Sequence, residues 1–111
     1  MDVQTKNVGD LIVVAVAGEL DGKTAPEAQS LILPLAEPGC KLLIDMSAVP
    51  YMSSAGLRMM LLIYRQISGN DGQAILVGLS DEIRDVMEVT GFLDYFETRD
   101  TYEDGLGAFT D

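Results

Sequence analysis

Apolar residues in this 111-residue chain alternate between short continuous runs and helical spacing. Runs of strand length stand at residues 11–18, 41–45 and 74–78, and a segment with helical character follows each of them. Near-continuous apolar runs are typical of strands buried on both faces, and strands separated by helices predict parallel pairing with right-handed crossovers. The pattern therefore predicts an α/β fold with a β-α-β-α-β core.

Shorter elements complete the predicted sheet. Residues 3–7 and the run at 11–18 flank a turn at 8–10 and predict an N-terminal hairpin, while residues 94–97 predict a short edge strand. About four helices are expected, one between Thr24 and Pro38 and three near 54–68, 81–90 and 102–109. The expected fold is a single domain over residues 1–111 with a mixed four- to five-stranded sheet, because a chain of this length has room for one core.

Thr24 predicts the start of the first helix. Its hydroxyl is expected to accept a hydrogen bond from the backbone N–H of Glu27, whose carboxylate reaches back to the Thr24 N–H in a capping box. Pro26 falls in the first turn, where its missing N–H costs little. The side chains at i, i+3, i+4 and i+7 predict the buried face of this helix: Ala28, Leu31, Ile32 and Leu35.

Composition removes several classes of function. The net charge of −11 repels a phosphate backbone, so direct binding of nucleic acid is not expected. With no His and the single Cys40, the chain lacks His-based catalysis, a multi-thiolate metal site and an internal disulfide, which agrees with a reducing cytoplasm. The longest apolar run, residues 11–17, is far shorter than the roughly 18 residues that cross a bilayer. No membrane span, cofactor or metal site is therefore expected.

The acidic residues gather toward the C-terminal end. Residues 81–111 hold ten acids against two bases, whereas residues 1–80 hold eight acids against five bases. Because these acids alternate with apolar residues such as Ile83 and Phe92, the pattern favours solvated outer helix faces over an acidic interaction tail.

The segment at 45–58 carries the least common chemistry. Ser53 and Ser54 stand at the predicted N-terminus of the second helix, just beyond the carboxyl end of a strand, where open α/β sheets form their crevices. Backbone N–H groups and the helix dipole favour an anion at this position, so a phosphate on either hydroxyl would meet hydrogen-bond donors. Composition alone favours a structural interpretation, in which Ser53 or Ser54 caps the helix and Gly56 is a packing contact.

The second predicted helix is apolar over more than one face. Such a helix is either buried on both sides in the core or partly covered by a partner, and clustered methionines suit an adaptable docking surface. The sequence leaves both interpretations open. The apolar residues are Leu57, Met59, Met60, Leu61, Leu62, Ile63 and Tyr64.

Two motifs resemble the STAS domain family of anti-sigma factor antagonists. The first is Gly18-Glu19-Leu20-Asp21 followed by Thr24-Ala25-Pro26-Glu27, and the second is Asp45-Met46-Ser47 with Tyr51-Met52-Ser53-Ser54-Ala55-Gly56-Leu57. The resemblance extends over nearly the whole chain with a matching order of elements. It implies the STAS fold and a binding protein rather than an enzyme.

The resemblance also implies control by phosphorylation. In this family, an anti-sigma factor that is also a serine kinase phosphorylates the serine two places before a Gly-Leu pair, and a phosphatase reverses the step. That serine is Ser54 here. The common family pattern is Asp-Ser-Ser/Thr-Gly-Leu, whereas this chain has Ser53 in place of the Asp and Ala55 in place of the second hydroxyl residue. Ser53 is therefore the alternative acceptor.

A docking edge follows from this resemblance. The unmodified edge would bind the anti-sigma factor and free the sigma factor, and a phosphate would block docking, with Arg58 four residues after Ser54 and within reach of it. Asp21 matches an acidic residue that lies near the acceptor in relatives, although a simple turn residue is an equal alternative. The free protein is expected to be a monomer or a weak dimer. The expected partner-binding residues are Asp21, Ser53, Ser54, Gly56, Leu57 and Arg58.

A second hypothesis belongs to another class. A non-phosphorylated STAS scaffold or sensory module would act through protein contact or through a small ligand in the crevice, and it would not depend on a kinase. Catalysis is disfavoured, because the chain contains neither a Walker phosphate loop nor a Gly-x-Ser-x-Gly elbow.

Overall fold

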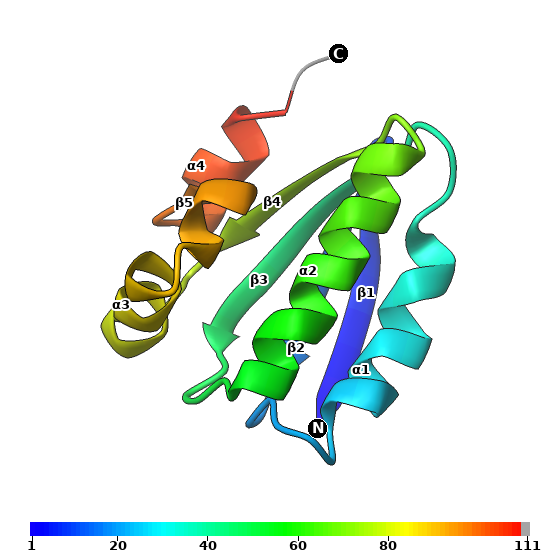
Figure 1. Cartoon of the computed structure of the whole chain (residues 1–111). Coiled ribbons are helices and arrows are strands. Elements are labelled where there is room, and N and C mark those ends of the chain that lie inside the picture. The colour runs from blue at the N-terminus through cyan, green and yellow to red at the C-terminus, as the bar shows by residue number, and fades with distance from the viewer. Residues whose placement is uncertain (110–111) are drawn as a thin grey trace.

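A five-stranded sheet in the order β1-β2-β3-β4-β5 carries α1 and α2 on one face and α4 on the other (Figure 1). The computed structural model describes residues 1–109, and Thr110 and Asp111, the end of the predicted domain, lie outside that range. The strands are β1 (Asp2–Val8), β2 (Leu11–Ala17), β3 (Lys41–Ala48), β4 (Gln73–Val77) and β5 (Glu97–Arg99). The helices are α1 (Ala25–Ile32), α2 (Ser54–Gly69), α3 (Asp81–Val89) and α4 (Tyr102–Gly107). None of the helices within residues 1–109 combines the length and hydropathy needed to cross a membrane.

The sheet confirms the predicted mixed topology. β1 and β2 pair antiparallel as the N-terminal hairpin, and the turn between them holds Gly9 at φ 64°, a left-handed conformation that glycine adopts without strain. β2 to β5 pair in parallel, each with its neighbour in the sequence. The carboxyl ends of these parallel strands therefore meet at one edge of the sheet, as the alternating pattern predicts.

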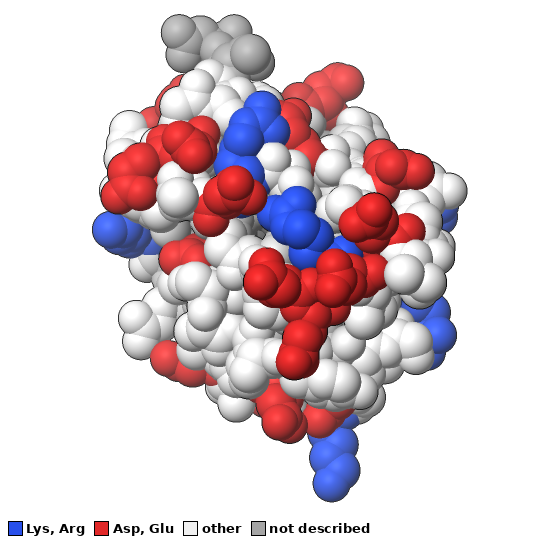
Figure 2. Space-filling view, turned by 90° about the vertical axis from the view of Figure 1, so that its left-hand side faces the viewer, with Lys and Arg blue, Asp and Glu red and all other residues white. Residues whose placement is uncertain are grey.

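The acidic C-terminal segment forms ordered elements. Figure 2 shows Asp and Glu side chains gathered on the side of the molecule that α3 and α4 occupy. All four acids of α3 are exposed, whereas Ile83 and Met87 of the same helix are buried. Arg84 pairs with Asp100 at 3.4 Å on this surface. These acids lie on solvated outer helix faces, which is the interpretation that the sequence pattern favours over an acidic interaction tail.

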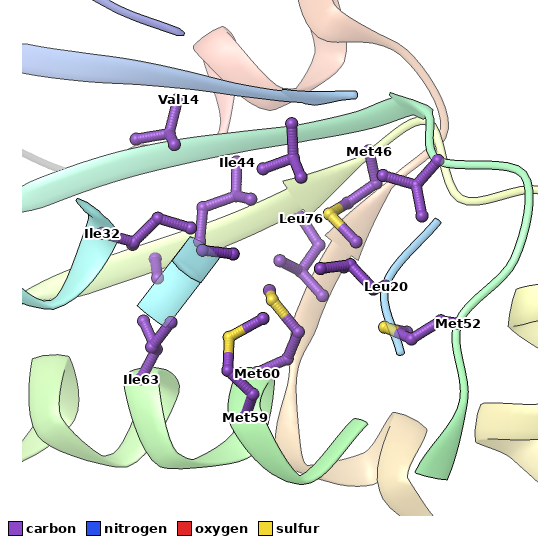
Figure 3. Packing of buried hydrophobic residues seen from close by; sticks show 14 of the residues in the cluster. Val14, Leu20, Ile32, Ile44, Met46, Met52, Met59, Met60, Ile63 and Leu76 are labelled. Atoms are coloured by element: carbon purple, nitrogen blue, oxygen red, sulfur yellow. The ribbon is translucent and has the colours of Figure 1, made fainter. Parts of the chain in front are cut away.

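Apolar clusters lie on both faces of the sheet. In the larger cluster, Ile44 and Leu76 of the sheet point toward Met60 and Ile63 of α2 (Figure 3). The smaller cluster lies beneath α4 and is formed by residues of β2, β3 and β4. Complete burial of an apolar side chain of this size contributes about 1.5–3 kcal/mol to stability, so the larger cluster holds α1 and α2 firmly on the sheet.

The sequence assigns the apolar residues of α2 either to the core or to a docking surface, and in the structure they lie on two different sides of the helix. Met60, Ile63 and Ile67 are buried in the cluster beneath α2, and Met59 is buried where α2 packs beside α1. Leu62, by contrast, is 47% exposed. One side of α2 thus belongs to the core, while another remains open to solvent.

The first helix buries a narrower face than its spacing predicts. α1 ends at Ile32, and the chain continues as the 3-10 helix η1 (Leu33–Leu35). Since a 3-10 helix has about three residues per turn, Leu35 leaves the face that Ala28 and Ile32 bury and is only half-buried. Leu31 lies at the margin of the stripe and is 48% exposed, so its predicted burial is wrong.

The last strand lies further along the chain than predicted. After α3, Gly91 at φ 80° turns the chain into the 3-10 helix η2 (Phe92–Tyr95), which occupies the first half of the predicted segment 94–97. This turn directs Phe96 into the core, where its ring packs edge-on against Tyr64 with centroids 5.0 Å apart. β5 therefore starts only after Phe96.

Gly105 provides a test of how closely α4 packs on the sheet. A Cβ at this position would lie 2.5 Å from Val77 Cγ1 and 2.6 Å from Leu43 Cδ1, whereas a Cβ at Gly107 would meet nothing within 4 Å. We expect Gly105→Ala to lower the free energy of unfolding by about 1–3 kcal/mol through overpacking. The matched Gly107→Ala should raise it by up to about 1 kcal/mol through helix propensity. Urea denaturation measures both, and equal stability of the two variants would contradict the packing.

Candidate functional site

Three loops follow β2, β3 and β4 at the carboxyl edge of the sheet, at residues 18–24, 49–53 and 78–80. Backbone hydrogen bonds join the first loop to the end of β3 and to the second loop. Gly18 donates to the carbonyl of Ala48 at 3.0 Å, and Leu20 donates to the carbonyl of Tyr51 at 3.0 Å. Ser53 in turn donates to the carbonyl of Leu20 at 2.8 Å. The segment before α1 and the segment before α2 therefore lie side by side, which brings the predicted residues Asp21, Ser53 and Ser54 to one edge.

The third of these loops packs against the end of β3. A Cβ on Gly78, which has φ +74°, would lie 2.8 Å from the Ser47 Cβ. A glycine is thus required both by the left-handed backbone and by the close approach. Segments that follow or end β2, β3 and β4 therefore lie together at this edge of the sheet.

The two adjacent serines have different roles in the structure. Ser53 is the N-cap of α2, with extended backbone at φ −79° and ψ 175°, and its Oγ accepts a hydrogen bond from the Gly56 N–H at 3.3 Å. Its carbonyl accepts the Leu57 N–H at 2.9 Å. Ser54 is the first helical residue, is exposed, and makes no side-chain hydrogen bond within residues 1–109. The Ser53 hydroxyl is occupied by helix capping, while the Ser54 hydroxyl is accessible.

Two of the predicted partner-binding residues lie below the surface. Gly56 is buried, and a Cβ there would lie 2.9 Å from the Leu20 carbonyl oxygen and 2.8 Å from the Met52 Cγ. Leu57 is 2% exposed. Both residues hold the start of α2 close to the neighbouring loop, while Arg58 on the next position is exposed.

Asp21 organises the loop before α1. Its Oδ1 accepts the backbone N–H groups of Lys23 at 2.9 Å and Thr24 at 3.1 Å, and its carbonyl accepts the Ala25 N–H at 2.9 Å. The hydrogen bond from the Thr24 N–H, followed by that from the Lys23 N–H, lowers the pKa of the Asp21 carboxyl below its ordinary value. The carboxylate is therefore held in one orientation at the edge.

The predicted capping box at Thr24 is wrong. Thr24 already has helical backbone angles, φ −92° and ψ −24°, and its side chain caps no helical N–H. Its Oγ1 instead accepts the Asp21 N–H at 3.0 Å and donates to the Glu19 carbonyl at 2.7 Å. An N-cap side chain needs extended backbone to reach the N3 amide, and the turn built by Asp21 does not provide it.

Two grooves border the exposed side of α2. One, of about 360 Å³, lies between α1 and α2 and includes Pro26, Met59 and Leu62. The other, of about 300 Å³, lies between α2 and η2 and includes Leu61 and Phe92. Sequence reasoning did not identify these grooves. One sequence pattern could have indicated them. Arg58, Leu62 and Arg65 follow an i, i+4, i+7 spacing, which places these exposed residues on a single face of α2.

The edge offers binding groups rather than a metal centre. Among residues 1–109, no group of three or more Cys, Asp or Glu side chains is arranged to hold a metal ion. Cys40 precedes β3 at the opposite edge of the sheet, and burial raises the pKa of its thiol, so it stays protonated at neutral pH. The polar groups at this edge are the exposed Ser54 hydroxyl, the half-buried Asp21 carboxylate, and the exposed side chains of Arg58 and Lys23.

Comparisons of the sequence and of the structure with known proteins indicate the same family. The model of the STAS domain matches residues 2–105. An anti-sigma-B factor antagonist of Staphylococcus aureus is 28% identical over 104 residues, which cover 93% of this chain and 96% of that protein. The crystal structure of an anti-sigma factor antagonist from Mycobacterium paratuberculosis has a TM-score of 0.84 at 28% identity and covers 99% of this chain and 94% of that one.

A Bacillus protein shares the same fold. The structure of the cell fate determinant SpoIIAA in its phosphorylated form has a TM-score of 0.71 at 21% identity, covering 96% of this chain and 97% of that one. The similarity confirms the predicted arrangement of a hairpin, a five-stranded mixed sheet and four helices.

Alanine substitution separates the two serines. We expect Ser53→Ala to lower the free energy of unfolding by about 1 kcal/mol, because the Gly56 N–H loses its cap. Ser54→Ala should change it by less than about 0.5 kcal/mol, since the exposed hydroxyl supports no hydrogen bond within residues 1–109. Urea denaturation at neutral pH is the measurement. Equal destabilisation by both substitutions would show that Ser54 has a structural role as well.

The lowered pKa of Asp21 predicts a pH-dependent contribution to stability. Since the folded pKa lies below the unfolded value of 3.8, the contribution is complete above that value and is lost as the pH falls through the folded pKa. We expect Asp21→Ala to lower the Tm at pH 7 and to differ less from wild type in acid. At pH 7 the Tm of Asp21→Asn, which keeps an acceptor oxygen, should lie between the Tm of Asp21→Ala and that of wild type. Thermal scans by circular dichroism test this, and a Tm difference independent of pH would contradict it.

Proposed function

The chain belongs to the STAS domain family, and from that membership we propose that it is an anti-sigma factor antagonist switched by phosphorylation of Ser54. It would act as a single STAS domain over residues 1–111. In the unmodified state it binds an anti-sigma factor with serine kinase activity and so releases a sigma factor. Phosphorylation ends this binding, and a phosphoserine phosphatase restores it.

The exposure of Ser54 carries the proposal. A kinase must reach the hydroxyl that it modifies, and the Ser54 side chain is open to solvent at the start of α2. Ser53 is half-buried, and its Oγ accepts the Gly56 N–H. Modification of Ser53 would remove a helix cap, so Ser54 is the favoured acceptor.

The proposed docking edge combines the exposed groups with the buried residues beneath them. Asp21, Ser54 and Arg58 supply polar contacts, with Ser53 beside them. Gly56 and Leu57 are buried and act by positioning the start of α2. The apolar groove between α1 and α2 adjoins this edge and includes Arg58. The edge therefore offers a few charged contacts next to apolar surface, a combination found in specific protein interfaces.

A phosphate at this edge would act between molecules. It brings about −1.5 to −2 charges into the interface, and a loss of about 2.8 kcal/mol weakens binding a hundredfold. Within the free protein the same anion lies at the N-terminal end of a helix, which favours a nearby negative charge by about 0.3–1 kcal/mol. Binding is therefore lost while the fold persists.

The relatives support the same role. The protein from Staphylococcus aureus is an anti-sigma-B factor antagonist, and the structure from Mycobacterium paratuberculosis is that of an anti-sigma factor antagonist. SpoIIAA, which has the same fold, has been solved in phosphorylated and unphosphorylated forms. The proposed role is one of binding without catalysis, and its place is the cytoplasm, where transcription occurs.

One observation favours the second candidate function, an unphosphorylated module that senses a small ligand. A cavity of about 260 Å³ lies on the face of the sheet that carries α4 and includes Lys6, Asp45 and Tyr102. The Lys6 Nζ lies 5.7 Å from the centroid of the Tyr102 ring. This cavity provides opposite charges and an aromatic wall, but it is separated from Ser54 by the sheet.

The test is the intact mass of protein purified from its own cells, followed by binding to the anti-sigma factor that co-purifies with it. We expect a fraction heavier by about 80 Da, which Ser54→Ala removes and Ser53→Ala retains. Ser54→Asp should bind the anti-sigma factor at least tenfold more weakly at an unchanged Tm. An unmodified mass with kinase-independent binding would favour the second candidate, and an aspartate variant that binds like wild type would contradict the switch.

A further inference from the structure

Arg58 lies one helical turn after Ser54 on the exposed side of α2. Residues four apart on a helix have Cβ atoms about 5–6 Å from each other, and helical side chains lean toward the N-terminus. A phosphate on Ser54 would therefore stand within reach of the Arg58 guanidinium. Because the guanidinium is planar and carries parallel N–H donors, it matches phosphate in a bidentate geometry.

Arg58 is also free to be recruited. Within residues 1–109, three of the cationic side chains form ion pairs with carboxylates: Lys41, Arg84 and Arg99. Two others lie over aromatic rings, Lys6 over Tyr102 and Arg65 over Tyr95. Arg58 has neither kind of contact in the described part of the chain, so binding a phosphate would break no existing pair.

Arg58 contributes to the walls of both grooves beside α2. The groove toward α1 and the groove toward η2 have Arg58 and Leu62 in common. A guanidinium drawn toward position 54 would leave the shared wall of both grooves at once. Modification of one exposed hydroxyl would thus change an apolar surface that extends along the helix.

Lys23 is the competing cation at this edge. It is exposed on the loop before α1, which the backbone hydrogen bonds hold beside the segment that precedes Ser54. Its backbone N–H donates to the Asp21 Oδ1, and the Asp21 carboxylate attracts its ammonium group. Lys23 therefore has an acidic neighbour of its own, which makes Arg58 the better receptor for a phosphate.

We propose that Arg58 binds the phosphate on Ser54 and, in doing so, withdraws its guanidinium from the wall that the two α2 grooves share. This inference rests on the proposed function, because it needs a phosphate on Ser54. It adds the residue that receives the phosphate and a way for the modification to reach beyond the modified side chain.

The test uses full-length protein in which phosphoserine is incorporated at position 54 during synthesis, so that no kinase is needed. A phosphorus NMR titration measures the second pKa of the phosphate, ordinarily about 6. Because a bound guanidinium favours the dianion, Arg58→Gln should raise this pKa by about 0.3–0.7 unit relative to the phosphorylated wild type. Arg58→Lys should retain part of the effect, while Lys23→Gln and Arg65→Gln should leave the pKa unchanged.

A second readout follows the grooves. We expect phosphorylation to shift the Arg58 side-chain N–H signal and the Leu62 methyl signals, and we expect the Leu62 shifts to disappear in Arg58→Gln. Circular dichroism would verify that this substitution of an exposed residue leaves the fold intact.

Equal phosphate pKa values in wild type and Arg58→Gln would overturn the proposal. It would also be overturned if only Lys23→Gln changed the phosphate pKa, or if the Leu62 methyl signals did not shift on phosphorylation. Failure of a cellular kinase to modify Ser54 bears instead on the proposed function. The two failures are distinguishable because the phosphoserine is installed without that kinase.

Discussion

The hydrogen bonds between the loops that precede α1 and α2 set the geometry of the whole edge. Three backbone bonds join residues 18–20 to residues 48–53, and the missing side chain of Gly56 lets α2 start against this ladder. Each buried backbone bond contributes only about 1 kcal/mol, yet leaving its donor or acceptor unpaired would cost more. The start of α2 is therefore fixed relative to the sheet, and with it the direction in which the first helical side chain points.

Because of this constraint, the chemically identical side chains of Ser53 and Ser54 have different roles. One serine has extended backbone and uses its hydroxyl to begin the helix, while the next already has helical backbone and leaves its hydroxyl in solvent. The helix start is thereby stabilised from within the chain and does not need the exposed group. A hydroxyl that the fold does not use can be modified without loss of the fold, which is what a reversible control site requires.

Local sequence patterns predicted most of the fold, and tertiary contacts explain where they fell short. The apolar runs identified β2, β3 and β4, and the segments predicted near 54–68 and 81–90 correspond to α2 and α3, because these signals lie within a few neighbouring residues. The capping role of Thr24 failed because Asp21 builds a turn that changes the Thr24 backbone. The burial of Leu57 and the exposure of Leu31 depend on how α2 and α1 are rotated on the sheet. Periodicity alone does not fix that rotation, either for the broad apolar surface of α2 or for the margin of the stripe on α1. The site segment was recognised from its motif, but the grooves beside α2 need α1 on one side and η2 on the other, and both approach through tertiary packing.

The sheet has the same strand order as the chain, from β1 at one edge to β5 at the other. The three backbone hydrogen bonds beside Ser54 come entirely from residues that precede α2. The acidic elements α3 and α4 follow later in the chain, and none of their residues takes part in the three hydrogen bonds that join residues 18–20 to residues 48–53. Their charges can therefore change without altering the hydrogen bonds that fix the start of α2.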